Sequence, residues 1–179
     1  MRIGFCRPEN ALDKQVWSGT PYYMYRALEM QFPGDVVCIG PLSSIFRFPA
    51  RMIRQASRVL THREYHYGYS RLMNLEYVRQ IRRTLMRDDF DVLFFPASSS
   101  ILKELDVDIP CVYLSDATFR LMTNYYPHFS NLWEFNKRSG ERAEAAAIEK
   151  AKALVYSSSW AARSAIEHYG ACPERTHVI

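Results

Sequence analysis

Short apolar segments alternate with segments of helical periodicity along the whole chain. Two of the apolar segments, "VLFF" and "CVYL", contain no polar residue, as expected for strands that are covered on both faces of a sheet. Small polar residues follow these segments, and a helical pattern comes next. The alternation predicts six strands, over residues 2–6, 35–40, 92–95, 111–114, 153–156 and 176–179.

Helices are predicted between these strands. Residues 71–87 carry apolar side chains at positions 72, 75, 78, 81 and 85, a spacing typical of one helix face. Pro49 is expected to confine the regular part of the second helix to the residues that follow it. Residues 61–70 have no clean period and are expected to form a loop. The other helices are predicted over residues 22–30, 46–60, 132–152 and 159–169.

Helix ends can be predicted from the capping residues, prolines and glycines near them. Ser18 or Thr20 is expected to cap the first long helix, with Pro21 at an early helical position. Ser159 is expected to cap the last helix, and Gly170 lies just beyond its end. Together these elements predict a Rossmann-like α/β fold, a doubly wound and mostly parallel sheet, in a single domain over residues 1–179.

The composition of the chain indicates a globular domain. The chain has 179 residues, of which 48% are hydrophobic and 23% charged, which is typical of a globular domain. No apolar run approaches the roughly 20 residues needed to span a bilayer, and the first ten residues are too polar for a signal peptide. The four cysteines and five histidines show neither metal-ligand nor disulfide spacing. We therefore expect a cytoplasmic protein without a metal ion or cofactor.

Small polar residues gather where the predicted strands end. The carboxyl ends of parallel strands lie at one edge of the sheet, where ligands of such folds bind. Hydroxyl groups and helix N-termini there suit a ligand rich in hydroxyls or phosphates. The plain alternative is that serine, threonine and glycine are common in any strand-to-helix loop. The four loops are Ser18-Gly19-Thr20, Ser98-Ser99-Ser100, Ser115-Asp116-Ala117-Thr118 and Ser157-Ser158-Ser159.

Asp116 is the candidate catalytic residue. It follows a strongly apolar strand by one small residue, at the edge where catalytic groups of such sheets gather. The alternative is that Asp116 only caps the short helix "ATFRLM". Familiar phosphate-binding motifs are absent, since neither G-x-G-x-x-G nor G-x-x-x-x-G-K-[ST] occurs, and there is no G-x-S-x-G elbow.

Positive charge is concentrated in residues 41–90. This segment contains ten arginines and four acidic residues, whereas the whole chain has a net charge of +4. A basic face beside an apolar one is the pattern of a helix that lies on an anionic membrane surface, and it is equally the pattern of a solvated face over a helix that packs on the sheet. No nucleic-acid-binding motif accompanies the charge, so we expect no nucleic-acid partner. Four arginines share one helical face: Arg47, Arg51, Arg54 and Arg58.

Three segments resemble the N-terminal domain of family 4 glycosyltransferases. They are "WSGTPYYMYRALE", "VYLSDATFRLMTNYYPHF" and "ERAEAAAIEKAKALVYSSSWAARSAIEHYG", in this order. The resemblance implies one half of a GT-B fold, which mainly binds the acceptor. It also implies metal-free, retaining transfer from a nucleotide-sugar held by a C-terminal domain. That domain and its E-x7-E pair are missing from this sequence, so we expect the isolated chain to be inactive.

The resemblance also assigns roles to the loops. It implies that Ser18-Gly19-Thr20 faces the donor diphosphate and the transferred sugar, with Gly19 allowing the backbone to approach closely. It places Asp116 near the reacting sugar. Two alternatives stay open, a stand-alone non-catalytic binding module of the same fold and a domain completed by a partner chain. The basic helix adds a possible peripheral contact with the inner face of the membrane.

Overall fold

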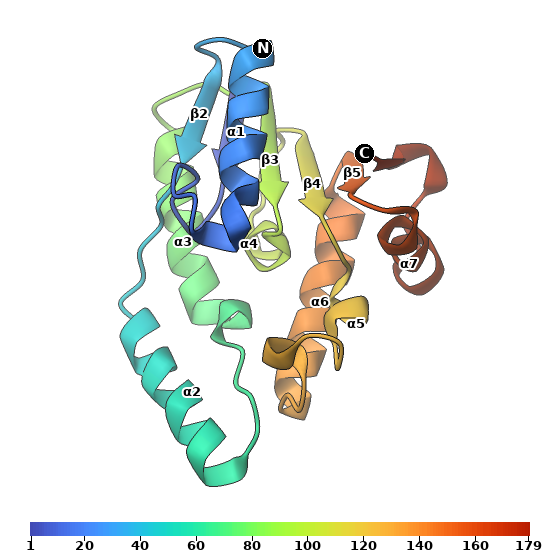
Figure 1. Cartoon of the computed structure of the whole chain (residues 1–179). Helices are drawn as coiled ribbons and strands as arrows, with labels where there is room; N and C mark the ends of the chain where they lie inside the picture. Colours follow the sequence, from blue (N-terminus) through green and yellow to red (C-terminus); the bar gives the residue numbers. More distant parts are fainter.

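The computed structural model describes all residues from 1 to 179, which form a six-stranded sheet with helices on its faces (Figure 1). All neighbouring strands are parallel. The predicted α/β class and all six strands are confirmed, with no boundary differing by more than one residue. The strand order is β2 (Val36–Ile39), β1 (Ile3–Cys6), β3 (Val92–Pro96), β4 (Cys111–Ser115), β5 (Ala153–Tyr156) and β6 (Thr176–Val178).

Seven α-helices and four short 3-10 turns connect the strands. The helix from Arg47 starts two residues before Pro49, which occupies the first turn, where its missing N–H group has no partner to lose. The predicted loop over 61–70 is confirmed apart from the 3-10 turn η2 (Tyr67–Tyr69). The α-helices are α1 (Thr20–Gln31), α2 (Arg47–Thr61), α3 (Arg71–Leu85), α4 (Ser99–Glu104), α5 (Phe119–Met122), α6 (Glu134–Lys150) and α7 (Ser159–Tyr169).

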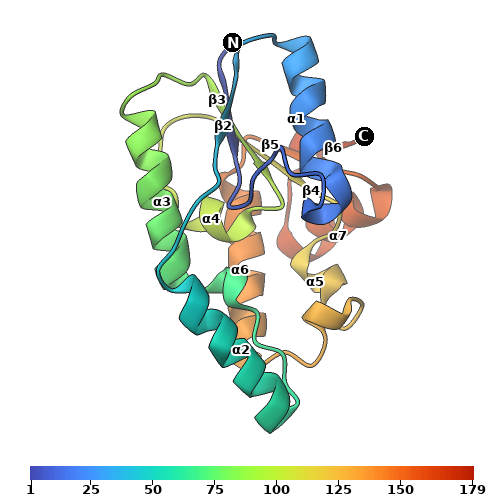
Figure 2. The same cartoon turned by 60° about the vertical axis from the view of Figure 1, so that its left-hand side comes forward.

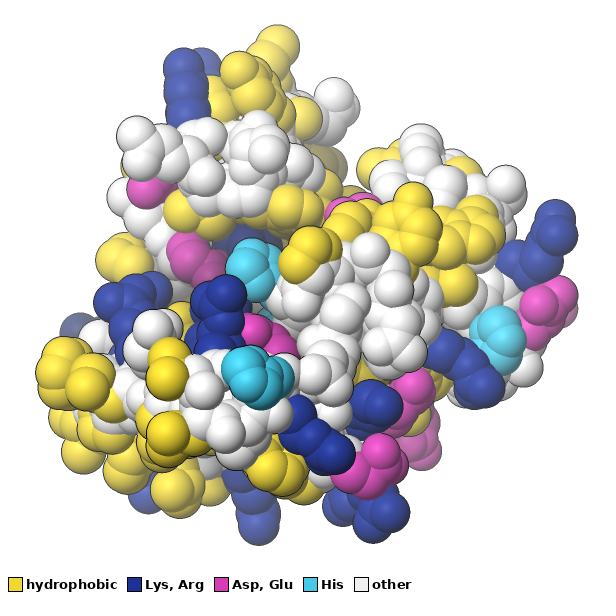
Figure 3. Space-filling model, turned by 60° about the horizontal axis from the view of Figure 1, so that its bottom comes forward, with side chains coloured by type: hydrophobic (Ala, Val, Ile, Leu, Met, Phe, Trp, Pro, Cys, Tyr) yellow, Lys and Arg dark blue, Asp and Glu magenta, His cyan; other side chains and the backbone are white.

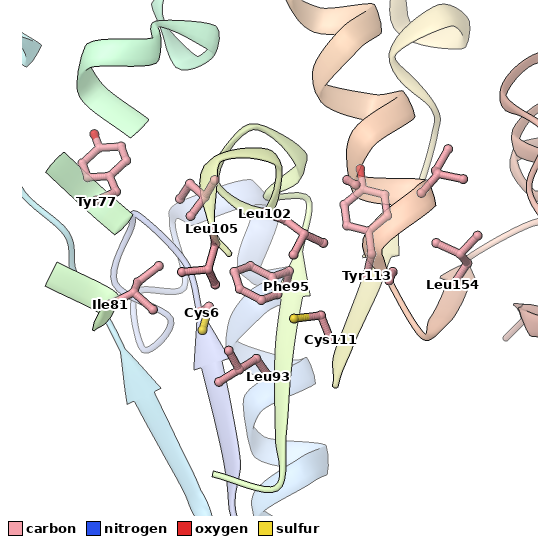
Figure 4. Packing of buried hydrophobic residues seen from close by; sticks show 14 of the residues in the cluster. Cys6, Tyr77, Ile81, Leu93, Phe95, Leu102, Leu105, Cys111, Tyr113 and Leu154 are labelled. Carbon is pink, nitrogen blue, oxygen red and sulfur yellow. The ribbon is translucent and has the colours of Figure 1, made fainter. Parts of the chain in front are cut away.

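Both faces of the sheet carry apolar side chains. On one face, the strand register places Phe95 beside Tyr113 and Leu93 beside Cys111, beneath side chains from α3 and α4 (Figure 4). Figure 2 separates α3 and α6 from α1, which lies across the sheet from them. Phe5 belongs to the smaller cluster that α1 covers. Each fully buried large side chain contributes roughly 1.5–3 kcal/mol relative to exposure.

The expected N-terminal caps of two helices are wrong. The residue before α1 is Gly19, in a left-handed conformation, and no side chain caps this helix. Ser158 rather than Ser159 caps α7, because its hydroxyl accepts the Ala161 N–H at 3.2 Å. Gly170 ends α7 in a left-handed conformation, as predicted.

Two segments extend beyond the carboxyl ends of the strands (Figure 1). One is α2 with the loop that follows it, and the other runs from α5 to the start of α6. Backbone hydrogen bonds join them: the Glu64 N–H donates to the Asn131 carbonyl at 3.0 Å and the Trp133 N–H to the Glu64 carbonyl at 3.4 Å. The two segments are therefore held together, and each borders one side of the space between them.

No helix of the structure has the length and hydropathy required to cross a bilayer.

Candidate active-site cleft

A cavity of about 670 Å³ opens at the carboxyl edge of the sheet, between the two extended segments. Figure 3 looks onto this end of the molecule, where acidic, basic and histidine side chains surround a hollow. Loops after β1, β3 and β4 form part of the cavity wall, and η2, η3 and the helices α2 to α6 contribute most of the rest. Seven Trp, Tyr and Phe residues line it: Trp17, Tyr67, Tyr69, Tyr77, Tyr113, Tyr126 and Phe129.

The structure brings the predicted residues of two loops together in this cavity. Ser98, Ser99 and Ser100 after β3 and Ser115 and Asp116 after β4 all line it. Two of the hydroxyls also hold their own loops, since Ser98 Oγ donates to the Pro96 carbonyl at 2.9 Å and Ser115 Oγ to the Ala117 carbonyl at 2.8 Å. Hydrogen bonds within these loops therefore hold their conformation without a ligand.

Asp116 does not cap a helix. Thr118 caps α5, because its hydroxyl accepts the Leu121 N–H at 3.5 Å. The capping alternative for Asp116 is therefore wrong. Its half-buried carboxylate lines the cavity and is paired with no cation of the chain. Both carboxylate oxygens are available to a ligand.

Other predicted residues lie outside the cavity wall. Thr118 is fully buried and bonds Ser164 Oγ at 2.7 Å. Ser158 caps α7, and Ser157 is exposed. The loop after β5 lies one strand farther from β3 than the loop after β4 does, about 5 Å across the sheet. The direct ligand contacts expected of these residues stay predictions.

The first predicted loop does not line the cavity, but the residue directly before it does. Trp17 lines the cavity, whereas Ser18, Gly19 and Thr20 do not. Trp17, Ser18 and Gly19 have positive φ angles of 45°, 55° and 80°. A Cβ atom at Gly19 would lie 3.2 Å from the Tyr23 ring and 3.3 Å from the Lys14 carbonyl oxygen. The fold itself requires a glycine here, independently of any ligand.

Arg7 is a cavity residue that the sequence reasoning missed. It directly follows β1, is 8% exposed, and donates from Nη1 to the Pro96 carbonyl at 2.9 Å. Its guanidinium group lies 5.3 Å from the centre of the Trp17 ring, and Nε lies 3.0 Å from Glu9 Oε2. Burial lowers the Arg7 pKa, and the neighbouring Glu9 opposes this shift. A charged residue immediately after a buried strand was the signal that could have revealed it.

Glu144 is the second missed residue. It is fully buried in α6, lines the cavity, and accepts hydrogen bonds from the Tyr113 hydroxyl at 3.1 Å on each oxygen. Burial raises its pKa to about 8, and hydrogen bonds from Tyr113 and Ser99 oppose the shift. Glu141 and Asp116 raise it further. Glu144 therefore holds its proton at neutral pH.

Two histidines, His66 and His128, line the mouth of the cavity, and an ion pair lies beside them. Arg54 forms a short ion pair with Glu64, and its Nη2 lies 3.0 Å from His128 Nδ1. His66 stacks on Phe129 with 4.7 Å between ring centres. Burial lowers the His66 pKa to about 4, and Arg54 adds to this shift, so His66 is neutral at physiological pH.

The predicted arginine patch divides in the structure. Arg47 lines the cavity and Arg51 is exposed, whereas Arg54 and Arg58 both pair with the nearly buried Glu64. The apolar side chains of α2 lie on another face and remain exposed, and only Ala50 of this helix is buried. The alternative in which the apolar face packs on the sheet is therefore wrong.

This combination of groups suits a sugar or polyol. Hydroxyl and amide groups can exchange hydrogen bonds with sugar hydroxyls, and aromatic rings offer flat apolar surfaces to the faces of a sugar ring. Asp116 adds an unpaired carboxylate within the same cavity.

One family model matches the chain. Its description is "Glycosyltransferase Family 4", and it covers residues 33–179, which include every cavity residue except Arg7, Pro8, Glu9 and Trp17. A search of curated proteins gave no match.

Proposed function

Because this chain belongs to glycosyltransferase family 4, we propose that its cavity binds the acceptor of a glycosyl transfer from a nucleotide-sugar. The observation that carries the proposal is Asp116, an unpaired carboxylate beside a floor of serine hydroxyls. Parallel sheets of this kind bind ligands at the carboxyl edge where it lies. The aromatic wall supplies the apolar surface that a sugar ring requires.

The proposed chemistry assigns separate roles to Asp116 and Glu144. Asp116 accepts a hydrogen bond from the acceptor hydroxyl and orients that oxygen toward the anomeric carbon of the donor. Glu144 stays protonated and adds no second negative charge near an anionic donor. We propose that the donor diphosphate is held by a second domain, that transfer retains the anomeric configuration, and that no metal ion or cofactor takes part. Stabilising the leaving diphosphate then depends mainly on groups outside this domain.

The test is Asp116→Asn in the protein together with its donor-binding domain, assayed with a panel of nucleotide-sugars. We expect the transfer rate to fall by about 10² to 10⁴, the range of a positioned proton-transfer group. Thermal stability should stay unchanged, because Asp116 caps no helix. Asp89→Asn, the same change at an exposed position outside the cavity, is the matched control and should keep the normal rate.

The competing function is a non-catalytic sugar-binding module. It predicts saturable saccharide binding without turnover of any nucleotide-sugar, even when the second domain or a partner chain is supplied. A normal transfer rate for Asp116→Asn would contradict the role given to this carboxylate.

A second part of the proposal concerns where the acceptor is presented. α2 exposes a row of large apolar side chains beyond the body of the sheet, and it also carries Arg47 and Arg51. We propose that this helix lies on an anionic membrane surface and brings the cavity to an acceptor held there. The four unpaired cysteines suit the reducing cytoplasm, so we place this contact on the inner face of the membrane.

A further inference from the structure

A second, apolar groove lies on the outer side of α2. It has a volume of about 510 Å³ and runs between the second half of α2, the loop after it and the first residues of α6. Six of the eight lining residues are hydrophobic. They are Ile53, Ala56, Leu60, Tyr65, Trp133 and Phe135, and the two polar ones are Ser57 and Thr61.

The polar groups of the groove are already bonded to the protein. Ser57 Oγ accepts the Trp133 Nε1–H at 2.7 Å and donates to the Arg63 carbonyl at 2.8 Å. The Thr61 hydroxyl donates to the Ser57 carbonyl at 2.6 Å. A peptide laid in the groove would find the Ser57 and Thr61 hydroxyls already bonded and only the Tyr65 hydroxyl as a side-chain partner, so most of its backbone groups would be desolvated without a hydrogen bond. A hydrocarbon chain has no such groups.

The groove continues into the exposed apolar face of α2. Leu60 is 78% exposed, Val59 is 62% exposed, and Phe48, in the first turn, is 72% exposed. Side chains of this size are normally covered, and a contiguous exposed apolar surface marks a binding surface. The groove is therefore the deepest part of a larger apolar surface.

Positive charge borders the groove. The Arg63 guanidinium group lies 4.8 Å from the centre of the ring of Trp133, which lines the groove. Arg51 and Arg58 add positive charge to the other, arginine-bearing face of α2. A ligand that has an apolar tail and an anionic head matches both the groove and its border.

We propose that this groove holds the hydrocarbon chain of an anionic, phosphate-bearing lipid. The site is separate from the sugar cavity but shares α2 with it, since Arg54, next to Ile53, reaches His128 at the cavity mouth. The proposal rests on the proposed function only in placing the acceptor at a membrane. A lipid bound here would hold the cavity mouth at the membrane surface.

The test is calorimetric titration of the chain with dodecyl phosphate below its critical micelle concentration. We expect saturable binding of one molecule per chain. Ala56→Phe should weaken binding at least tenfold, because the added ring fills the groove while position 56 is exposed and tolerates it. Met86→Gln, at an apolar position that is 86% exposed and belongs to neither the groove nor α2, is the matched control and should bind normally. Leu60→Gln provides a second groove variant, with circular dichroism checking that each variant folds.

Other ligands distinguish the parts of the proposal. Inorganic phosphate alone should not bind measurably, and dodecyl maltoside, which has the same tail without charge, should bind more weakly than dodecyl phosphate. Equal binding of wild type and both groove variants would overturn the site. Self-association of the free chain that Ala56→Phe abolishes would instead identify a second copy as the occupant and overturn the lipid. Neither result bears on the sugar cavity, which the Asp116 variant tests separately.

Discussion

Glu144 shows how strongly a single residue depends on its surroundings. The carboxyl group is fully buried, accepts hydrogen bonds from the Tyr113 hydroxyl, and has no cationic partner. Tyr69 and Tyr156 lie close enough for the carboxyl charge to raise their pKa values, and the Tyr156 hydroxyl is itself buried without a partner. Ionising Glu144 would therefore place an uncompensated charge in the interior.

This arrangement makes stability depend on pH. The pKa of Glu144 is about 8 in the folded chain and near 4.5 when unfolded. Its stabilising contribution is thus complete below about pH 4.5 and is lost as pH rises toward 8. The free energy of unfolding of Glu144→Gln should exceed that of wild type by an amount that grows as pH rises. Between pH 4.5 and pH 8.5 this difference should increase by on the order of a few kcal/mol. Chemical denaturation at both pH values measures this.

The control for this experiment is Glu149→Gln, at an exposed position of the same helix. It should follow the wild-type pH dependence. Parallel pH curves for wild type and Glu144→Gln would show that Glu144 ionises normally in the folded chain.

Of the carboxyl groups in the cavity, the sequence allowed Asp116 to be predicted but not Glu144. Asp116 was found because it closely follows an apolar strand, a position that parallel sheets place at the ligand edge. Glu144 lies in a run of strong helix formers, where a glutamate normally faces solvent. Its burial follows from α6 packing beside β4 and α4, which no local pattern reveals.

At the scale of elements, Gly140 determines how closely α5 approaches α6. A Cβ atom at this position would lie 2.1 Å from the Phe119 ring, which is fully buried. Glycine in a helix interior costs roughly 1 kcal/mol relative to alanine, so the close contact offsets a local disadvantage.

Replacing this glycine tests which effect is larger. Gly140→Ala should lower the free energy of unfolding by about 1–3 kcal/mol, since overpacking outweighs the gain in helix propensity. Thermal denaturation measures the change. Ser139→Ala, the adjacent position in the same helix, should stay within about 0.5 kcal/mol of wild type. A more stable Gly140→Ala variant would mean that Phe119 moves aside at little cost.

Whole elements were easier to predict than their ends or their uncovered faces. The strands were recognisable because unbroken apolar runs survive only where both sheet faces are covered. The start of α1 was not, because the glycine before it follows two left-handed residues, Trp17 and Ser18. The amphipathic pattern of α2 was visible in the sequence, but only the tertiary structure shows that its apolar face stays uncovered.

At the scale of the molecule, one core unites most of the chain. A cluster of 25 buried residues draws on the sheet and on α3, α4, α6 and α7, and a smaller cluster lies under α1. Long-range contacts of this kind favour unfolding in a single cooperative step.

We therefore expect the isolated chain to unfold in one thermal transition, with coincident loss of far- and near-ultraviolet circular dichroism. It should also lack transferase activity alone, because the groups proposed to hold the donor diphosphate lie outside it. Early loss of the near-ultraviolet signal would contradict a single well-packed core. Steady turnover of a nucleotide-sugar by this chain would contradict the division of roles between two domains.

The strand order has a consequence for how the sheet can assemble during synthesis. β1 lies between β2 and β3, so its second neighbour becomes available only when residues 92–96 leave the ribosome. From that point each new strand adds to the edge formed by the one before it, through β4, β5 and β6. The sheet can therefore grow in the direction of translation, and no strand already in place has to be displaced.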